Sequence, residues 1–157
     1  MKYSFIKYTT EYTALAESFF DEEARRSTGC DDGWEDYYSY YLCDDAEEKL
    51  EEDFFVRLIY IENRPLGIIA FGIHDRTLTV SEFVVAPDLR GKGHGSLILS
   101  ELLREYTVSC GMEYDRAMAV IFPDNEASQK AFEKAGFVFD SAHPDGDAWY
   151  YVYMNRK

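Results

Sequence analysis

A glycine-rich turn between a strand and a helix constrains the fold of this chain more than any other feature. Residues 79–85 are rich in β-branched and aromatic side chains and stop before Pro87, which predicts a strand. From Ser96 onward, apolar residues recur at spacings of three and four, which predicts an amphipathic helix. Between them stand three glycines and two cations, in the order Arg90, Gly91, Lys92, Gly93, His94 and Gly95. Strand, glycine turn and helix in this order are typical of an α/β unit.

This turn predicts an anion site. Unpaired N–H groups at a helix start carry partial positive charge, and glycines leave room for a phosphate to approach them. Arg90 and Lys92 add full charges that could neutralise a diphosphate. The alternative is a glycine-rich loop whose cations are merely solvated. The P-loop motif is excluded because Lys92 is followed by Gly93 and not by Ser or Thr. The dinucleotide-binding motif Gly-x-Gly-x-x-Gly is excluded because Gly91, Gly93 and Gly95 are spaced two apart.

A different pattern fits. Arg90-x-x-Gly93-x-Gly95 follows a Val-x-Pro strand end, and residues 125–137 read NEASQKAFEKAGF. The first segment resembles the pyrophosphate-binding motif of the GNAT superfamily of acetyl-CoA-dependent N-acetyltransferases. The second resembles that superfamily's penultimate helix. The resemblance implies acetyl-CoA (coenzyme A) as the cofactor.

The expected fold is α/β (α+β), GNAT-like, in a single domain over residues 1–157. Its mixed, mostly antiparallel central sheet would have about six to seven strands, flanked by about four helices. Turn residues separate strands at 54–62, 67–73 and 79–85, which predicts a meander. Strands 79–85 and 116–122 are joined through a helix, so they should be parallel neighbours, and the resemblance implies that they splay apart at the cofactor site. Strands 3–8, 137–140 and 149–154, and a helix that Thr10 caps at Glu11, complete the expected elements.

The resemblance also implies which residues hold the cofactor. The pantetheine arm would pair with exposed backbone on the 79–85 strand, the pyrophosphate would lie on residues 90–96, and two polar residues of the later helix would face the arm. The expected contacts are Val84, Val85, Arg90, Gly91, Lys92, Gly93, His94, Gly95, Ser96, Asn125, Ser128 and Phe132. His94 is interpreted as a solvent-facing loop residue, not a catalyst.

Glu82 is the candidate catalytic base, because it precedes Val84 by two residues on the strand that would present the thioester. The alternatives are a structural carboxylate paired with a cation, or a water chain to the carboxylates of residues 31–53. Phe132 stands where many family members place a tyrosine that acts as the general acid. A phenyl ring cannot donate a proton. Water or another tyrosine, such as Tyr37, Tyr38 or Tyr150, would have to replace it.

Residues 31–53 carry eleven carboxylates and one cation among several aromatic residues. A helix is expected over residues 34–53. One interpretation is a substrate wall, in which carboxylates hold a cation and aromatic faces pack on its carbon chain. The residues proposed for this wall are Trp34, Tyr37, Tyr38 and Tyr41. The other interpretation is a solvated acidic helix whose aromatic residues pack on the sheet.

The composition of the chain limits which classes of partner it is expected to bind. The formal charge is −14, which disfavours nucleic acids and anionic membranes and favours small cationic partners. The three cysteines have no CxxC spacing, so neither a disulfide framework nor a metal site is expected. The N-terminal residues contain no apolar leader, which favours a cytoplasmic protein. The predicted function is N-acetylation of a primary amine, with a small cationic acceptor. Alternatives are an acyl-CoA-binding sensor or scaffold and a nucleotide-phosphate binder. The family resemblance also suggests a homodimer through the strand near residues 149–153.

Overall fold

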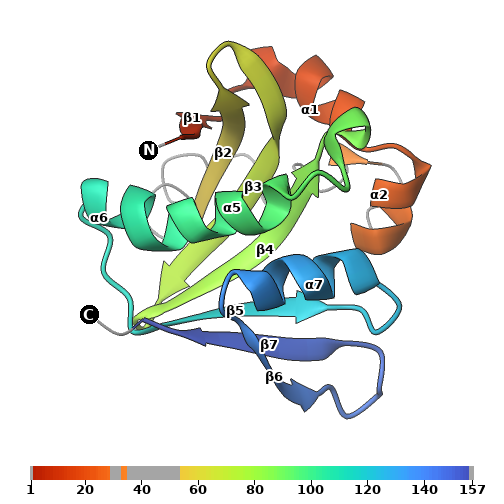
Figure 1. The fold of residues 1–157 in the computed structure, drawn as a ribbon, viewed down its shortest axis with the longest axis vertical. Coiled ribbons are helices and arrows are strands. Elements are labelled where there is room, and N and C mark those ends of the chain that lie inside the picture. Colours follow the sequence, from red (N-terminus) through yellow and green to blue (C-terminus); the bar gives the residue numbers. More distant parts are fainter. Residues whose placement is uncertain (1, 29–32, 35–53, 156–157) are drawn as a thin grey trace.

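The computed structural model describes residues 2–28, 33–34 and 54–155, and its strands form one seven-stranded sheet (Figure 1). The sheet order is β1-β2-β3-β4-β5-β7-β6. The strands are β1 (Ser4–Lys7), β2 (Phe54–Ile61), β3 (Arg64–His74), β4 (Thr77–Val85), β5 (Arg116–Ile121), β6 (Val138–Ala142) and β7 (Trp149–Met154). The helices are α1 (Thr13–Phe19), α2 (Glu22–Thr28), α5 (His94–Glu101), α6 (Thr107–Ser109) and α7 (Glu126–Lys134).

Only β4 and β5 pair in parallel, and all other neighbouring strands of this sheet are antiparallel. The reason is the connection: tight hairpins join β2 to β3 and β3 to β4, whereas helix α5 lies between β4 and β5 in the chain. The expected fold class is therefore confirmed. β7 inserts between β5 and β6, so the closing hairpin joins the sheet through its second strand.

Helices α5 and α7 lie together in front of the sheet in Figure 1 and contact each other. We call the sheet face that they cover the α7 face. Helix α1 packs against β3, whose residues from Leu66 to Phe71 are all buried. Because neighbouring side chains of a strand point to opposite faces, this run requires cover on both sides of the sheet.

The N-terminal helical region differs from the prediction. Thr10 does not cap a helix at Glu11; it lies in a 3₁₀ turn, Thr10–Tyr12, that precedes α1. A second helix, α2, follows after a break at Phe20 and Asp21. The Asp21 carboxylate accepts a hydrogen bond from the Ala24 N–H (2.9 Å), which satisfies a donor at the start of α2.

A π-helical turn, Leu102–Tyr106, interrupts the helix that begins as α5. Within it, the Leu103 carbonyl accepts hydrogen bonds from the Thr107 hydroxyl (3.0 Å) and the Tyr114 hydroxyl (2.6 Å). Burial raises the pKa of Tyr114 to about 12. Tyr114 therefore acts as a neutral donor that ties the loop before β5 to this helix.

We expect Tyr114→Phe to lower the free energy of unfolding by about 1–2 kcal/mol, because it leaves a buried carbonyl with one hydrogen bond fewer. Urea denaturation followed by circular dichroism measures the change. Tyr12→Phe is the matched control, since this half-buried tyrosine makes no hydroxyl hydrogen bond within the described residues. Equal losses in the two variants would contradict the assignment.

Candidate active site

A gap opens between β4 and β5 where their pairing ends. The parallel register joins Thr77–Val80 to Arg116–Ala119, and both strands continue beyond it without pairing to each other. A cavity of about 220 Å³ lies in this gap, and we call it the slot. It is lined by Ser27, Thr28, Val80, Ser81, Glu82, Phe83, Ala119, Val120, Ile121, Phe122, Asn125, Ser128 and Phe132. The expected splayed pair is present.

A β-bulge at Ser81 decides which way Glu82 points. Val80 pairs with Phe71 of β3, but Glu82 pairs with Ala70, so Ser81 has no partner there. Directly paired residues share a face of the sheet, and Ala70 and Phe71 are on opposite faces. Glu82 therefore points away from the face that holds Val80. Simple alternation along β4 would have placed both on one face.

The α7 face is the one that holds Val80. The Phe83 ring meets the Phe132 ring of α7 edge-on, with centroids 6.5 Å apart. Phe83 pairs with Ile69, which shares its face with Phe71 and hence with Val80. Glu82 thus lies on the opposite face, at the edge of the slot, and only 7% of its surface is exposed.

The register also tells which backbone groups of β4 face the gap. The Ala86 N–H donates to the Leu66 carbonyl (2.7 Å) of the β3 side, and this antiparallel pattern repeats every second residue. Val84 therefore pairs with β3, whereas the peptide groups of Phe83 and Val85 point toward the gap. Of the two residues expected to pair with pantetheine, the structure turns Val85 but not Val84 in that direction.

The slot opens into a larger groove of about 720 Å³ between the glycine turn, α2 and α7. We call this cavity the groove. At its edge, Gly91 (φ 76°) and Gly93 (φ 83°) adopt left-handed backbone conformations, with open space where a Cβ atom would lie. Helix α5 begins at His94, two residues earlier than predicted. The glycine turn thus leaves the first N–H groups of α5 accessible from the groove.

Gly95 has a different role from Gly91 and Gly93. A Cβ atom there would lie 3.3 Å from the Cβ of Ala131 on α7. Its absence lets α5 and α7 approach closely. Ser96 lines the groove, and its hydroxyl donates a long hydrogen bond (3.4 Å) to the Gly93 carbonyl.

Arg90 is held by the protein itself. Its guanidinium donates to both oxygens of Asp21 (2.9 Å each), to the Phe19 carbonyl (3.1 Å) and to the Val85 carbonyl (2.9 Å). Partial burial would raise the pKa of Asp21, but the Ala24 N–H and Arg90 together hold it below its ordinary value. Arg90 therefore joins the end of β4 to the α1–α2 connection, and it lines the groove in that fixed position.

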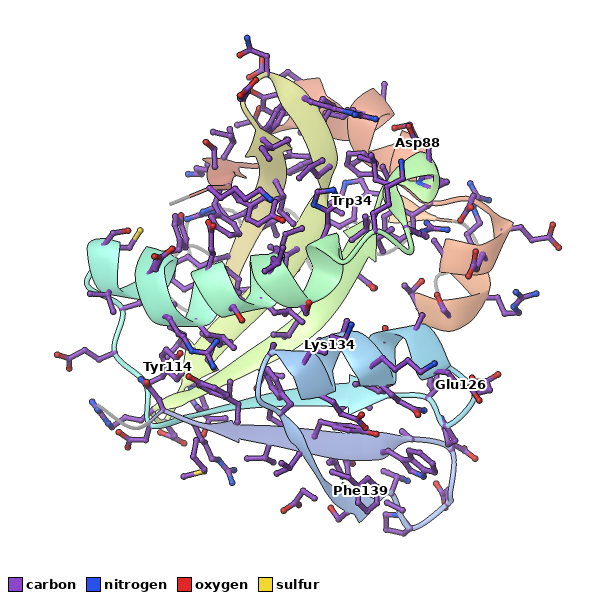
Figure 2. All side chains as sticks on the ribbon, viewed as in Figure 1. Trp34, Asp88, Tyr114, Glu126, Lys134 and Phe139 are labelled. Atoms are coloured by element: carbon purple, nitrogen blue, oxygen red, sulfur yellow. The ribbon has the colours of Figure 1, made fainter. Side chains whose placement is uncertain are left out.

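Two lysines that sequence reasoning missed supply further positive charge. Lys130 and Lys134 are one turn apart on α7 and line the groove with Glu23 and Glu126. In Figure 2, Glu126 lies at the start of α7, and Lys134 lies farther along this helix on the side toward α5. Their spacing of four residues, opposite a glycine turn, is the signal that could have identified them.

His94 joins the glycine turn to the N-terminal strand. Its Nδ1 lies 3.0 Å from the Tyr3 hydroxyl, and Glu101 accepts the N–H groups of Lys2 (2.7 Å) and Tyr3 (2.8 Å). Burial lowers the pKa of His94, and the nearby cations Lys2, Lys92 and Arg64 lower it further. The neutral imidazole and the Tyr3 hydroxyl share one hydrogen bond, so His94 is a structural residue that also lines the groove.

This environment predicts a pH-dependent loss of stability. Because the folded pKa of His94 lies below the unfolded value of about 6.5, the unfolded chain binds more protons in that range. The stabilisation is fully present above about pH 6.5 and is lost as the pH falls through the folded pKa. In urea titrations from about pH 7.5 to pH 5, His94→Gln should reduce the slope of unfolding free energy against pH. An identical slope would contradict this role.

Asn125 and Ser128 line both cavities. The Asn125 Oδ1 accepts from the Ser128 N–H (3.2 Å), which caps α7. Phe132 lies one turn beyond Ser128, is 4% exposed, and packs on Phe83 and Phe137. The described residues that line the groove and the slot include no tyrosine, so Tyr150 on β7 is not brought to them.

The residues predicted for a substrate wall are only partly described. Trp34 is fully buried, with its ring against Tyr8 and Phe20. The structure therefore places Trp34 in the core and not on an open wall, because its apolar ring is better removed from water. Tyr37, Tyr38 and Tyr41 lie outside the described residues, as does the rest of the helix expected up to residue 53.

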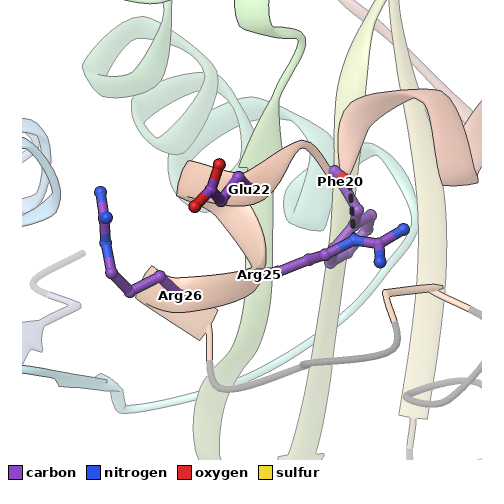
Figure 3. Close-up of a pocket in the computed structure, with 4 residues that line it drawn as sticks. All are labelled: Phe20, Glu22, Arg25 and Arg26. Carbon is purple, nitrogen blue, oxygen red and sulfur yellow. Dashed lines mark hydrogen bonds between the residues drawn. The ribbon is translucent and has the colours of Figure 1, made fainter.

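A third, open cavity of about 640 Å³ lies on α2 (Figure 3). It is lined by Phe20, Glu22, Arg25 and Arg26, whereas Glu23, Ala24 and Ser27 of the same helix line the groove. The Arg25 Nε donates to the Phe20 carbonyl (3.0 Å), and the Arg25 guanidinium lies 3.8 Å from Glu17. These contacts give Arg25 a structural role, because they tie α2 to Phe20 and to Glu17 of α1.

Comparison with known proteins decides the family. The model of the acetyltransferase (GNAT) family matches residues 12–137, which includes the glycine turn, the slot and α7. The chain belongs to the GNAT family. Its members are acetyl-CoA-dependent N-acetyltransferases, and this chain is an enzyme of that type. A search of curated proteins found no match.

Solved structures share the GNAT fold over nearly the whole chain. The aminoglycoside acetyltransferase AAC(6')-Ib, in complex with paromomycin and acetyl-CoA, is 19% identical with a TM-score of 0.77, covering 98% of this chain and 94% of that one. A putative phosphinothricin N-acetyltransferase is 21% identical (TM-score 0.73, 99% of each chain). Spermidine N-acetyltransferase from Vibrio cholerae, with CoA and spermine, is 12% identical (TM-score 0.70, 98% and 95%).

The GNAT cofactor fits the residues that the structure brings together. The groove combines open left-handed glycines, a helix start and lysines, which suits a diphosphate. The gap-facing peptides of Phe83 and Val85 suit an amide-bearing arm that adds to an open strand edge. In the part of the chain that is described, no helix is both long and apolar enough to span a membrane.

Proposed function

We propose that this GNAT enzyme acetylates the primary amine of a small cationic acceptor, with Glu82 as the base. The observation that carries the proposal is the slot: it joins the groove to a buried carboxylate on the opposite face of the sheet. A cofactor held in the groove and an amine beside Glu82 would therefore meet in the gap between β4 and β5.

Bound acetyl-CoA supplies an acetyl group activated as a thioester. Glu82 receives the proton that the ammonium group, with an ordinary pKa of about 10, must lose before it can attack. The gap-facing N–H of Phe83 or Val85 donates to the carbonyl oxygen as negative charge develops there. The new C–N bond replaces the C–S bond, and Phe132 leaves the departing thiolate without a side-chain acid at that position. A thiolate with a pKa of about 8.5 is a tolerable leaving group.

Charge supports a cationic acceptor. The chain carries a formal charge of −14, which attracts cations and raises their local concentration. Two of the similar structures contain bound polycationic amines, an aminoglycoside and spermine. Residues 31–53, with eleven carboxylates and one cation, account for −10 of this formal charge.

Calorimetry and turnover test the proposal together. Acetyl-CoA should bind in calorimetry, and release of free thiol should saturate with at least one amine of a panel containing spermidine, kanamycin and a lysine peptide. The product should carry one acetyl group by mass spectrometry. Absence of thiol release with every cationic amine, but release with a neutral or anionic amine, would contradict the cationic acceptor.

Phe132 favours a second candidate, a catalytically weak enzyme whose main role is to bind acyl-CoA as a sensor or scaffold. A positioned acid typically contributes roughly 10²–10⁴-fold in rate, and the described slot lining offers no tyrosine to supply it. This candidate predicts acetyl-CoA binding with only slow thiol release for every amine. The same experiment therefore separates the two.

A further inference from the structure

Strand β5 is buried on one face and open on the other. Ala117, Ala119 and Ile121 are at most 4% exposed and point to the α7 face, because Ala119 pairs with Val80 there. Val120 points to the opposite face and is 50% exposed. In Figure 1, α7 lies in front of β5, so this open face is turned away from the viewer. A single exposed valine is normal, so the neighbours of Val120 decide its meaning.

The neighbours of Val120 on this face are also apolar. Val120 pairs directly with Tyr150 of β7, and directly paired residues share a face of the sheet. Two residues along, Met118 pairs with Val152, which pairs in turn with Val138 of β6. Val138 is 64% exposed. The open face therefore carries a contiguous apolar patch across β5, β7 and β6, and such patches mark binding sites.

One end of this patch meets the slot. Val120 lines the slot from β5, and Glu82 points to the same face of the sheet from β4. The groove proposed for the cofactor lies at α7, on the other face. An acceptor that enters the slot opposite the cofactor therefore has Val120 beside it, followed by Tyr150 on the next strand.

The loop between β6 and β7 places a second ring beside Tyr150. The ring centroids of His143 and Tyr150 are 6.2 Å apart. The His143 Nδ1 accepts from the Asp145 N–H (3.2 Å), and the His143 N–H donates to the Ala148 carbonyl (2.8 Å), so the loop holds this imidazole in place. We call Val120, Tyr150 and His143 the shelf. It offers a branched aliphatic side chain next to the slot and two rings beyond it.

We propose that the acceptor is a monocationic primary amine whose apolar body, alkyl or aryl, lies on the shelf while its nitrogen enters the slot. This inference rests on the proposed function, because it names the acceptor class of the same site. Val120 and Tyr150 carry no carboxylate, so a second ammonium group over them would lose water without gaining an ion pair. An apolar body loses water favourably there.

The chemistry of the transfer is unchanged by the choice of amine. The C–N bond forms and the C–S bond of acetyl-CoA breaks, which gives an N-alkyl acetamide and free CoA thiol. The ammonium group gives up two protons: one passes through the base to solvent, and the other ends on the leaving thiolate.

Hexylamine and 1,6-diaminohexane are a matched pair that tests the acceptor class, because they differ only in a second ammonium group at the far end. Hexylamine should have a kcat/KM at least about 10-fold higher, although the net charge of the chain favours the dication in solution. From propylamine to hexylamine, kcat/KM should rise by about 2–4-fold per methylene group. A diamine used as well as hexylamine would overturn the inference and leave acetylation of a cationic amine intact.

Two substitutions at Val120 locate the site. Val120→Ser should lower kcat/KM for hexylamine by about 10-fold, and should leave ethylamine almost unchanged because its short chain ends before the shelf. Val120→Asp adds a carboxylate and should lower the ratio of hexylamine to diaminohexane by at least about 10-fold. This ratio is measured within one variant, so a fall in folding yield does not affect it. Val108→Ser, at an exposed position on α6, is the control and should change neither result.

A second copy of the chain is the other occupant that an apolar sheet face could have. Sedimentation velocity of the wild type and of Val138→Ser separates the two, since Val138 lies on the patch but away from the slot. A monomer, or a dimer that Val138→Ser leaves intact, would keep the patch open to the acceptor, as expected. A dimer that this substitution dissociates would overturn the inference. Lack of thiol release with every amine would overturn the proposed function, and the inference with it.

Discussion

Replacing Glu82 by glutamine should lower kcat/KM for the acceptor amine by roughly 10²-fold or more, because the variant removes a positioned base while keeping the size of the side chain. Glu82 is buried at the slot, so few other groups can take over its role within the described residues. The loss should be largest at low pH, where free amine is scarce, and smaller near about pH 9. Initial rates of thiol release across this pH range measure the effect.

Acetyl-CoA binding is the internal check for this variant. Its dissociation constant should change less than about 3-fold, since Glu82 points away from the α7 face, where the groove proposed for the cofactor lies. Glu105→Gln, at an exposed position on the π turn, is the matched control and should keep the wild-type rate. A pH–rate profile of Glu82→Gln that coincides with the wild type would remove Glu82 from the base role.

Replacing Gly93 by aspartate should weaken acetyl-CoA binding by roughly 10²-fold. The new carboxylate would stand at the start of α5, where a diphosphate needs the positive end of the helix and the nearby lysines. Gly93 has open space at its Cβ position, so the side chain itself fits. Calorimetric titration with acetyl-CoA and with desulfo-CoA measures the loss without requiring turnover.

Gly93→Ala separates charge from backbone strain. The left-handed conformation at φ 83° costs alanine about 1–2 kcal/mol, whereas aspartate tolerates it better. Strain alone would therefore make alanine the more damaging substitution, while an anion site makes aspartate the more damaging one for binding. Alanine should cost about 5–10-fold in affinity. If the Gly93→Asp variant binds acetyl-CoA as tightly as the Gly93→Ala variant does, the glycine turn is not the diphosphate site.

Local patterns in the sequence determined the framework of the site. The glycine turn between β4 and α5 and the Asn125 cap of α7 follow from backbone requirements within a few residues. The parallel β4–β5 pair followed from the helix between them. Such features depend on short-range sterics and hydrogen bonding, and a single sequence records them.

The tertiary structure alone decided which groups are available for chemistry. The bulge at Ser81 reverses the alternation of β4 and places Glu82 opposite Val80, and this depends on how β3 pairs with β4. Asp21, distant in the sequence, occupies the guanidinium of Arg90. The Trp34 ring is buried against Tyr8 and Phe20. Residue type and spacing are local, but partners and facing directions arise from long-range packing, which no periodicity along one chain encodes.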